Sequence, residues 1–168
     1  MREIKYIGVH HSLSGFGDGR TIIRWHTQPE PKGGRGWTFP GYQAVICNGY
    51  RTSAEMIAGK YDAALDGHMD TLLSDMLASN GCKNCNAHSL HVCMIGNFDE
   101  ERPTEKQMKK LIEELAYWCG KYQLDPLKAI LGHHEMQVLI GEKHTKTCPG
   151  RNVNMSVIRN AVAERMKV

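Results

Sequence analysis

Histidine and cysteine side chains at three separate places in the chain have the chemistry of metal ligands. Nine of the 168 residues are histidines, and one adjacent pair is His10-His11. A second pair, His133-His134, precedes Glu135, and Cys148 lies further along the chain. Imidazole nitrogens and thiolate sulfur are typical zinc donors, and three protein ligands leave the fourth tetrahedral position open for water, as in catalytic zinc sites. The spacing alone leaves open that each pair is one buried, hydrogen-bonded ring beside a solvated one.

Short apolar segments precede both histidine pairs and predict the strands that position them. Residues 5–10 and 128–131 each predict a β-strand. Side chains at strand ends project into the crevice where α/β proteins bind ligands. Successive side chains of a strand point to opposite faces, so His11 is not expected to share the site of His10. We expect His11 and His134 to orient neighbouring groups or to be structural, and a swapped ligand assignment is the alternative.

The other segments predict a mixed sheet flanked by helices. Asn48-Gly49 favours a hairpin that joins a strand at 42–47 to a return strand at 50–56. Thr104-x-x-Gln107 is a capping box that opens a helix whose apolar face continues to Cys119. The remaining expected elements are a short helix at 21–26, a loop at 28–36, a strand at 89–95, a helix at 154–166 with Asn154 as N-cap, and a segment at 58–87 that either contains a short helix at 69–78 or is a surface insertion. This pattern predicts one α/β domain over residues 1–168 with a central mixed β-sheet.

Composition excludes several classes of protein. Hydrophobic residues make up 41% and charged residues 23% of the chain, which is ordinary for a globular domain. The net charge of +3 comes without a dense Lys/Arg stripe, so no nucleic-acid partner is expected. No window approaches the roughly 20 apolar residues of a membrane span. The first residues lack the apolar stretch of a signal peptide. We therefore expect synthesis in the cytoplasm as a monomer, with release by another protein if the substrate lies outside the membrane.

The six cysteines fall into two groups besides Cys148. Cys47, Cys93 and Cys119 lie in apolar stretches and are expected to be small buried side chains. Cys82 and Cys85 form a C-x2-C pair that His88 and His91 extend. This run is compatible with a second metal site, with a labile disulfide, or with plain loop thiols.

Five short segments, in order along the chain, together resemble one enzyme family. They are YIGVHHS (6–12), GWTFPGY (36–42), HSLHVCMIG (88–96), LGHHE (131–135) and KTCP (146–149). The chain resembles the zinc-dependent N-acetylmuramoyl-L-alanine amidases, which include phage amidase-type lysozymes, cytoplasmic recycling amidases and peptidoglycan-recognition proteins. The resemblance to the phage branch implies that His10, His133 and Cys148 bind Zn²⁺.

The same resemblance implies that Tyr42 and Lys146 act in the catalytic step. A thiolate ligand reduces the positive charge on zinc, and the Lys146 ammonium can stabilise the oxyanion that forms when water attacks an amide carbonyl. The Tyr42 phenol can position that water or donate a hydrogen bond, but it is a poor base because its reference pKa is about 10. Trp37 is expected either to line the groove or to pack in the core, and His68 to correspond to a groove histidine. Gln43 stands where relatives often have His, which removes one polarising ring.

The resemblance implies a peptidoglycan hydrolase that cleaves the amide bond between N-acetylmuramic acid and L-alanine. A phage or prophage endolysin that acts on the cell wall after release is favoured. A cytosolic muropeptide-recycling amidase and a non-catalytic recognition module are the alternatives. Because non-catalytic relatives commonly lack the cysteine ligand, the presence of Cys148 favours the enzyme.

Overall fold

The structure, a computed structural model that describes residues 2–143 and 145–167, is built on one five-stranded sheet. The strands lie in the order β3-β2-β4-β1-β5, and only β3 is antiparallel to its neighbour. Their bounds are β1 Tyr6–His11, β2 Ala44–Ile46, β3 Met69–Thr71, β4 Ser89–Met94 and β5 Ile130–Gly132. The predicted mixed sheet with flanking helices is therefore confirmed.

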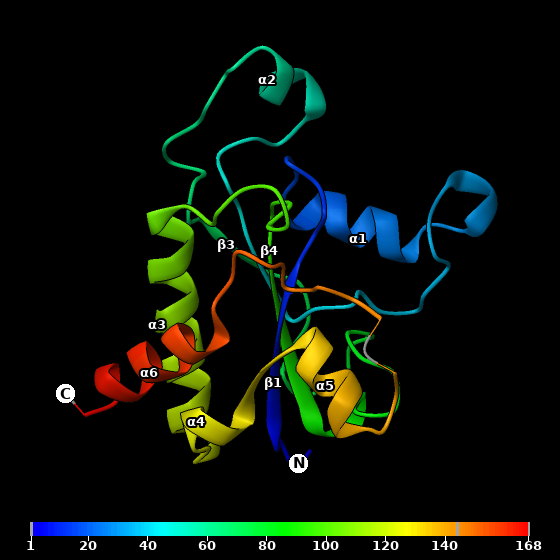
Figure 1. The fold of residues 1–168 in the computed structure, drawn as a ribbon. Coiled ribbons are helices and arrows are strands. Elements are labelled where there is room, and N and C mark those ends of the chain that lie inside the picture. Colours follow the sequence, from blue (N-terminus) through cyan, green and yellow to red (C-terminus); the bar gives the residue numbers. More distant parts are fainter. Residues whose placement is uncertain (1, 144, 168) are drawn as a thin grey trace.

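Helices cover both faces of the sheet (Figure 1). Helices α3, α4 and α6 lie on one side, and α1 and α5 lie on the other. The helix bounds are α1 Gly19–Thr27, α2 Ser53–Ile57, α3 Glu105–Tyr122, α4 Pro126–Ala129, α5 His133–Leu139 and α6 Met155–Arg165, with 3-10 turns at Glu30–Lys32 and Asn86–His88. None of the helices in the described part of the chain is long and apolar enough to cross a membrane.

The strict alternation of β1 and β4 sorts their side chains between the two faces. Ile7 and Val9 of β1, with Leu90 and Val92 of β4, belong to the main core beneath α3 and α6. The intervening residues of these strands face α1 and α5, because successive strand side chains point in opposite directions. These intervening residues are Gly8 and His10 on β1, and His91 and Cys93 on β4. The face toward α1 and α5 therefore carries the polar side chains that could do chemistry.

The strongest helix signal in the sequence is confirmed. Thr104 caps α3, since its hydroxyl accepts a hydrogen bond from the Gln107 amide while the Gln107 side chain accepts from the Thr104 amide. Leu111, Leu115 and Cys119 are fully buried on the inner face of the helix. Burying a leucine side chain stabilises a fold by about 1.5–3 kcal/mol, so this face anchors α3 to the sheet. The strand expected at 5–10 and the helices expected at 21–26 and 154–166 are also present, with bounds that differ by a few residues.

The predicted hairpin at Asn48-Gly49 is wrong. A type I′ turn needs positive φ at both central residues, but only Gly49 has it, at 97°. The Asn48 side chain instead bonds the Gly15 carbonyl and the Tyr50 amide. Residues 53–57 then form α2, because Thr52 and Glu55 make a reciprocal capping box. The expected return strand at 50–56 is therefore replaced by a turn and a short helix.

The antiparallel partner of β2 comes from the poorly patterned segment at 58–87. Ala44, Val45 and Ile46 pair with residues 69–71, so the short helix considered at 69–78 is wrong. The outer edge of β2 offers unpaired backbone groups, and β3 satisfies them. The apolar run at 128–131 is divided in a similar way, because α4 takes its first residues and β5 the rest.

Candidate metal centre

Three side chains from distant parts of the chain meet at one edge of the sheet. His10 lies near the end of β1, His133 is the first residue of α5, and Cys148 lies in the loop before α6. One donor atom from each lies within 4.8 Å of the other two. The His10 Nδ1 atom is 3.6 Å from the Cys148 sulfur. The structure thus brings together the three residues singled out as metal ligands.

Strand pairing places the two histidines side by side. β1 and β5 are parallel neighbours, with Val9 opposite Gly132. The residue that follows each of them is a histidine, so both histidines reach the same carboxyl edge of the sheet, where α/β proteins bind ligands. The ring centroids of His10 and His133 are 4.8 Å apart.

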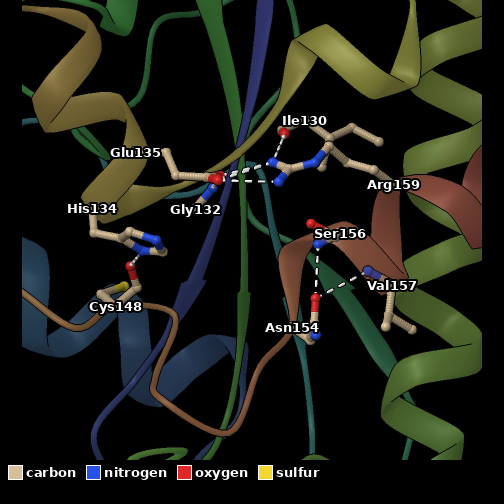
Figure 2. A network of polar contacts seen from close by, with 9 residues as sticks. All are labelled: Ile130, Gly132, His134, Glu135, Cys148, Asn154, Ser156, Val157 and Arg159. Atoms are coloured by element: carbon tan, nitrogen blue, oxygen red, sulfur yellow. Dashed lines mark hydrogen bonds and ion pairs between the residues drawn. The ribbon is translucent and has the colours of Figure 1, made fainter.

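The loop that carries Cys148 is fixed by two side chains. His134 binds the Cys148 carbonyl oxygen twice, through its ring Nδ1 at 2.9 Å and its backbone amide at 3.0 Å. The ring contact is drawn in Figure 2. Asp99 accepts hydrogen bonds from the Thr147 hydroxyl and the Arg151 amide on either side. The cysteine side chain is therefore presented by a loop with several fixed backbone positions.

Glu135 fixes the start of the helix that carries His133. Its carboxylate accepts the Gly132 amide and forms an ion pair of 2.9 Å with Arg159 of α6. Arg159 also donates to the Ile130 carbonyl of β5, and Figure 2 shows the whole contact. The side chains of Arg159 and Glu135 are only 17% and 28% exposed, respectively. Each residue of the His133-His134-Glu135 segment thus has a separate structural task.

Burial sets the protonation states of the three candidate ligands. It lowers the pKa of His10 far below the usual value and, with help from Lys146, that of His133 to about 4. Both rings are therefore neutral at pH 7, with a lone pair available. Burial raises the pKa of the Cys148 thiol to about 12, while the His11 backbone amide and Lys146 oppose that shift. In the absence of a cation the site holds two imidazoles and a protonated thiol.

These residues fit a zinc ion. Neutral imidazole and cysteine sulfur are donors that zinc accepts, and three of them leave a position for water. A divalent cation would favour the thiolate over the thiol, so binding should release a proton. The three donor atoms come from three separate segments and lie within 4.8 Å of one another, and three ligands would leave the fourth tetrahedral position of a zinc ion open.

Tyr42 lies beside the candidate ligands. Its ring centroid is 5.0 Å from that of His10. Burial, with the nearby Cys93 and Cys148 sulfurs, raises the pKa of its phenol well above 10. Tyr42 therefore keeps its proton at neutral pH and can donate a hydrogen bond.

A residue that the sequence did not single out, His26, holds the turn before Tyr42. Its Nδ1 accepts the Gly41 amide at 3.0 Å, and its ring packs against Trp37 and Tyr42. Burial and the neighbouring Arg35 lower the pKa of His26 to about 4, so the ring is a neutral acceptor. A single histidine within a short helix carries no signal for this role, because the contact depends on a loop fifteen residues away.

The candidate ligands open into a cleft of about 980 Å³. Trp37 lines it beneath the guanidinium of Arg35, which lies 5.2 Å above the ring. Lys146 is exposed and lines the same cleft. The charged residues of the lining are Arg35, Lys83, Lys146 and Arg151, against Asp99 and Glu142. Cations therefore outnumber acids around the candidate metal centre.

Of three other residues considered from the sequence, His11 lines the cleft, whereas His68 and Gln43 are not among its lining residues. His68 is half-exposed, contacts Asp70 of β3 and is not among the residues that line the cleft. Gln43 is buried, and its side chain bonds the His91 amide, Ser79 and Leu77. It braces β4 against the segment at 77–79. His11 accepts the Phe98 amide with Nδ1.

The C-x2-C run forms no second metal cluster among the described residues. Cys82 and Cys85 are buried free thiols that contact each other. The His88 ring is turned to the Glu3 carbonyl. His91 contacts His10 instead, with 2.9 Å between His91 Nδ1 and His10 Nε2. The expected burial of Cys47, Cys93 and Cys119 is confirmed.

Comparisons with known proteins identify the family and the fold. Residues 1–151 match the family model described as N-acetylmuramoyl-L-alanine amidase. The amidase LysC from Clostridium intestinale URNW superimposes with a TM-score of 0.73 at 21% identity, over 96% of this chain and 87% of that one. Drosophila PGRP-LB gives 0.68 at 19% identity, over 94% and 81%. The Ph2119 endolysin of a Thermus scotoductus bacteriophage gives 0.66 at 18% identity, over 96% and 86%. Comparison with curated protein sequences gives no significant match.

Proposed function

Because the chain belongs to the N-acetylmuramoyl-L-alanine amidase family, we propose that it hydrolyses the amide bond between N-acetylmuramic acid and L-alanine in peptidoglycan with the help of zinc. The observation that carries this proposal is the convergence of His10, His133 and Cys148 within 4.8 Å at the floor of a large cleft. A bound Zn²⁺ would supply Lewis acidity for the attack of water on the amide carbonyl. The three residues would hold the ion with two neutral imidazoles and one thiolate.

The other residues of the cleft have separate tasks in this proposal. The protonated Tyr42 phenol donates a hydrogen bond to the substrate carbonyl or to the attacking water, and its raised pKa prevents it from acting as the base. The Lys146 ammonium stabilises negative charge that develops on the carbonyl oxygen. The cationic excess of the cleft suits the carboxylates of a peptidoglycan stem peptide.

The same family includes enzymes with different biological settings. Two of the similar structures are endolysins, from Clostridium intestinale and from a Thermus phage. This supports an endolysin of phage or prophage origin, made in the host cytoplasm and acting on the cell wall after release. The substrate would be polymeric peptidoglycan rather than a free muropeptide.

The test measures zinc content together with lysis of purified sacculi. The wild-type chain should bind one zinc ion, reduce the turbidity of sacculi and release new L-alanine amino termini. Cys148→Ser should lose both zinc and activity, whereas Cys119→Ser, on the buried face of α3, should keep both in the folded fraction. Unchanged lysis by Cys148→Ser would contradict the ligand assignment. Zinc binding without new amino termini would favour a recognition module, as in some peptidoglycan-recognition proteins.

A further inference from the structure

His91 of β4 lies directly behind the candidate ligand His10. Its Nδ1 is 2.9 Å from His10 Nε2, while the other nitrogen of His10, Nδ1, faces the Cys148 sulfur. Both rings are buried, with 1% and 0% exposure for His10 and His91. The contact follows from strand register, because His10 lies opposite Cys93 and Gly8 lies opposite His91 on the same face of the sheet.

Two glycines make the space that the His91 ring occupies. A Cβ atom at Gly8 would lie 2.5 Å from His91 Nδ1, and one at Gly81 would lie 2.3 Å from His91 Cγ. Real Cβ atoms do not approach other atoms this closely, so any side chain at either position would displace the imidazole. The ring is thus held between two stretches of backbone, and Gln43 fixes the His91 amide at 2.8 Å.

We propose that His91 is a positioning residue that fixes the orientation and the tautomer of His10 for metal binding. The inference rests on the proposed zinc site. A neutral imidazole carries one proton, so His10 can offer the Nδ1 lone pair to a cation only when the proton is on Nε2. That proton needs an acceptor, and within the described residues His91 Nδ1 is the atom in position to accept it.

The reverse arrangement of the proton would disable the site. If His91 Nδ1 were the donor, His10 Nε2 would accept, and Nδ1 of His10 would carry the proton that blocks metal binding. His91 Nε2 is buried and has no hydrogen-bond partner within the described residues. Metal binding at His10 therefore selects the tautomer in which His91 accepts, and leaves an N–H group of His91 unsatisfied.

A neutral acceptor also suits the charge of this ligand set. One of the three ligands is already a thiolate, so a dication held by the set has a net charge of about +1. A carboxylate behind His10 would cancel that remaining charge and weaken the attraction for a developing oxyanion. An imidazole orients His10 without adding charge.

The experiment replaces His91 by Leu, which removes the acceptor, and by Asn, whose amide oxygen can take the place of Nδ1. Zinc affinity is measured by competition with a chelator, and the ring nitrogens of His10 are followed by ¹⁵N NMR. We expect His91→Leu to weaken zinc binding by about 10- to 100-fold, the usual effect of losing a partner behind a ligand. His91→Asn should restore most of that affinity and keep the His10 proton on Nε2.

A second pair of variants keeps the test decisive if His91→Leu does not fold. Gly81→Ala should displace the His91 ring and weaken zinc binding without changing any polar group. Gly120→Ala is the matched control, because a Cβ there meets no atom within 4 Å, and zinc affinity should not change. Wild-type affinity in folded His91→Leu or Gly81→Ala would overturn the role of His91 while leaving the proposed function intact. A wild-type chain that binds no zinc would overturn both.

Discussion

At the scale of single residues, each candidate ligand is held by a different neighbour. His10 is backed by His91, and Cys148 is held through its carbonyl by His134. His133 depends on the start of α5, which Glu135 fixes. His10 can therefore be disturbed through His91, on β4, separately from the other two ligands, whose neighbours His134 and Glu135 are adjacent on α5. Mutations behind the ligands should change metal affinity, and mutations that face the cleft should change turnover.

Tyr42 belongs to the second group. We expect Tyr42→Phe to lower kcat on sacculi by about 10²-fold, the usual cost of removing one hydrogen-bond donor to a developing oxyanion. KM and zinc affinity should change little, because the ring and its packing on His10 and His26 remain. Steady-state kinetics and zinc titration check both statements. The control is Tyr50→Phe, whose ring packs on Tyr61 outside the cleft and which should keep full activity.

The buried His26 predicts a dependence of stability on pH. Its folded pKa of about 4 lies below the unfolded value of about 6.5, so the unfolded chain binds more protons between these values. Its contribution is complete above pH 6.5 and is lost as the pH falls toward 4. One such group changes the free energy of unfolding by about 1.4 kcal/mol per pH unit near pH 5.

His26→Asn keeps an acceptor for the Gly41 amide but removes the titrating ring. Urea denaturation of the metal-free chains between pH 5 and 7 should therefore give a shallower pH dependence for the variant than for the wild type. Parallel curves for the two chains would show that His26 has the same pKa in the folded and the unfolded chain, against this prediction.

At the scale of elements, α5 links the candidate site to the rest of the fold. Arg159→Met removes the bonds from α6 to Glu135 and to the Ile130 carbonyl. We expect a loss of about 2 kcal/mol in the free energy of unfolding, since hydrogen bonds to buried charged groups contribute about 1.5–3 kcal/mol. Zinc affinity should also fall, because the position of His133 depends on the start of α5.

Arg165→Met is the matched control on the same helix. Its guanidinium is about half exposed and lies 3.9 Å from Glu113, and exposed pairs of this kind contribute about 0–1 kcal/mol. Denaturant unfolding curves should show a larger loss of unfolding free energy for Arg159→Met than for Arg165→Met. Equal losses of unfolding free energy would mean that Arg159, between α5 and α6, contributes no more to stability than the exposed Arg165.

At the scale of the whole molecule, the metal should tie β1, α5 and the loop before α6 into one unit. A ligand that binds only the folded chain stabilises it by about 2.7 kcal/mol at a free concentration of 100 times Kd. For a chain of this length we expect zinc to raise Tm by about 5–10 °C at that concentration. Thermal melts in chelator and in buffered zinc check this.

Cys148→Ala should lose most of the zinc-dependent rise in Tm. Mg²⁺ should give no rise in the wild type, because a hard cation does not favour imidazole and thiolate donors. A similar rise with zinc in Cys148→Ala would mean that the ion stabilises the chain from another place.

The clearest predicted element, α3, is present because its own residues supply both its N-terminal cap and its buried face. The capping box at Thr104 and the periodic apolar face after it are sufficient for α3. The hairpin predicted at Asn48-Gly49 is absent because the Asn48 side chain makes its hydrogen bonds with the Gly15 carbonyl and the Tyr50 amide instead. Residues 69–71 became a strand because the edge of β2 was available, which their own sequence does not encode.

The candidate site, like the fold, was in part predictable from the local sequence and in part decided by contacts between distant segments. The sequence by itself determined the donor types, the strands that lead to His10 and to His133, and the resemblance that selects Cys148 from six cysteines. Only the tertiary structure decided which side chains stand behind the donors. His91, His26 and Arg159 act across strand register, a packed loop and a helix pair. Such contacts depend on how distant segments align in space, and no local pattern of residues records that alignment.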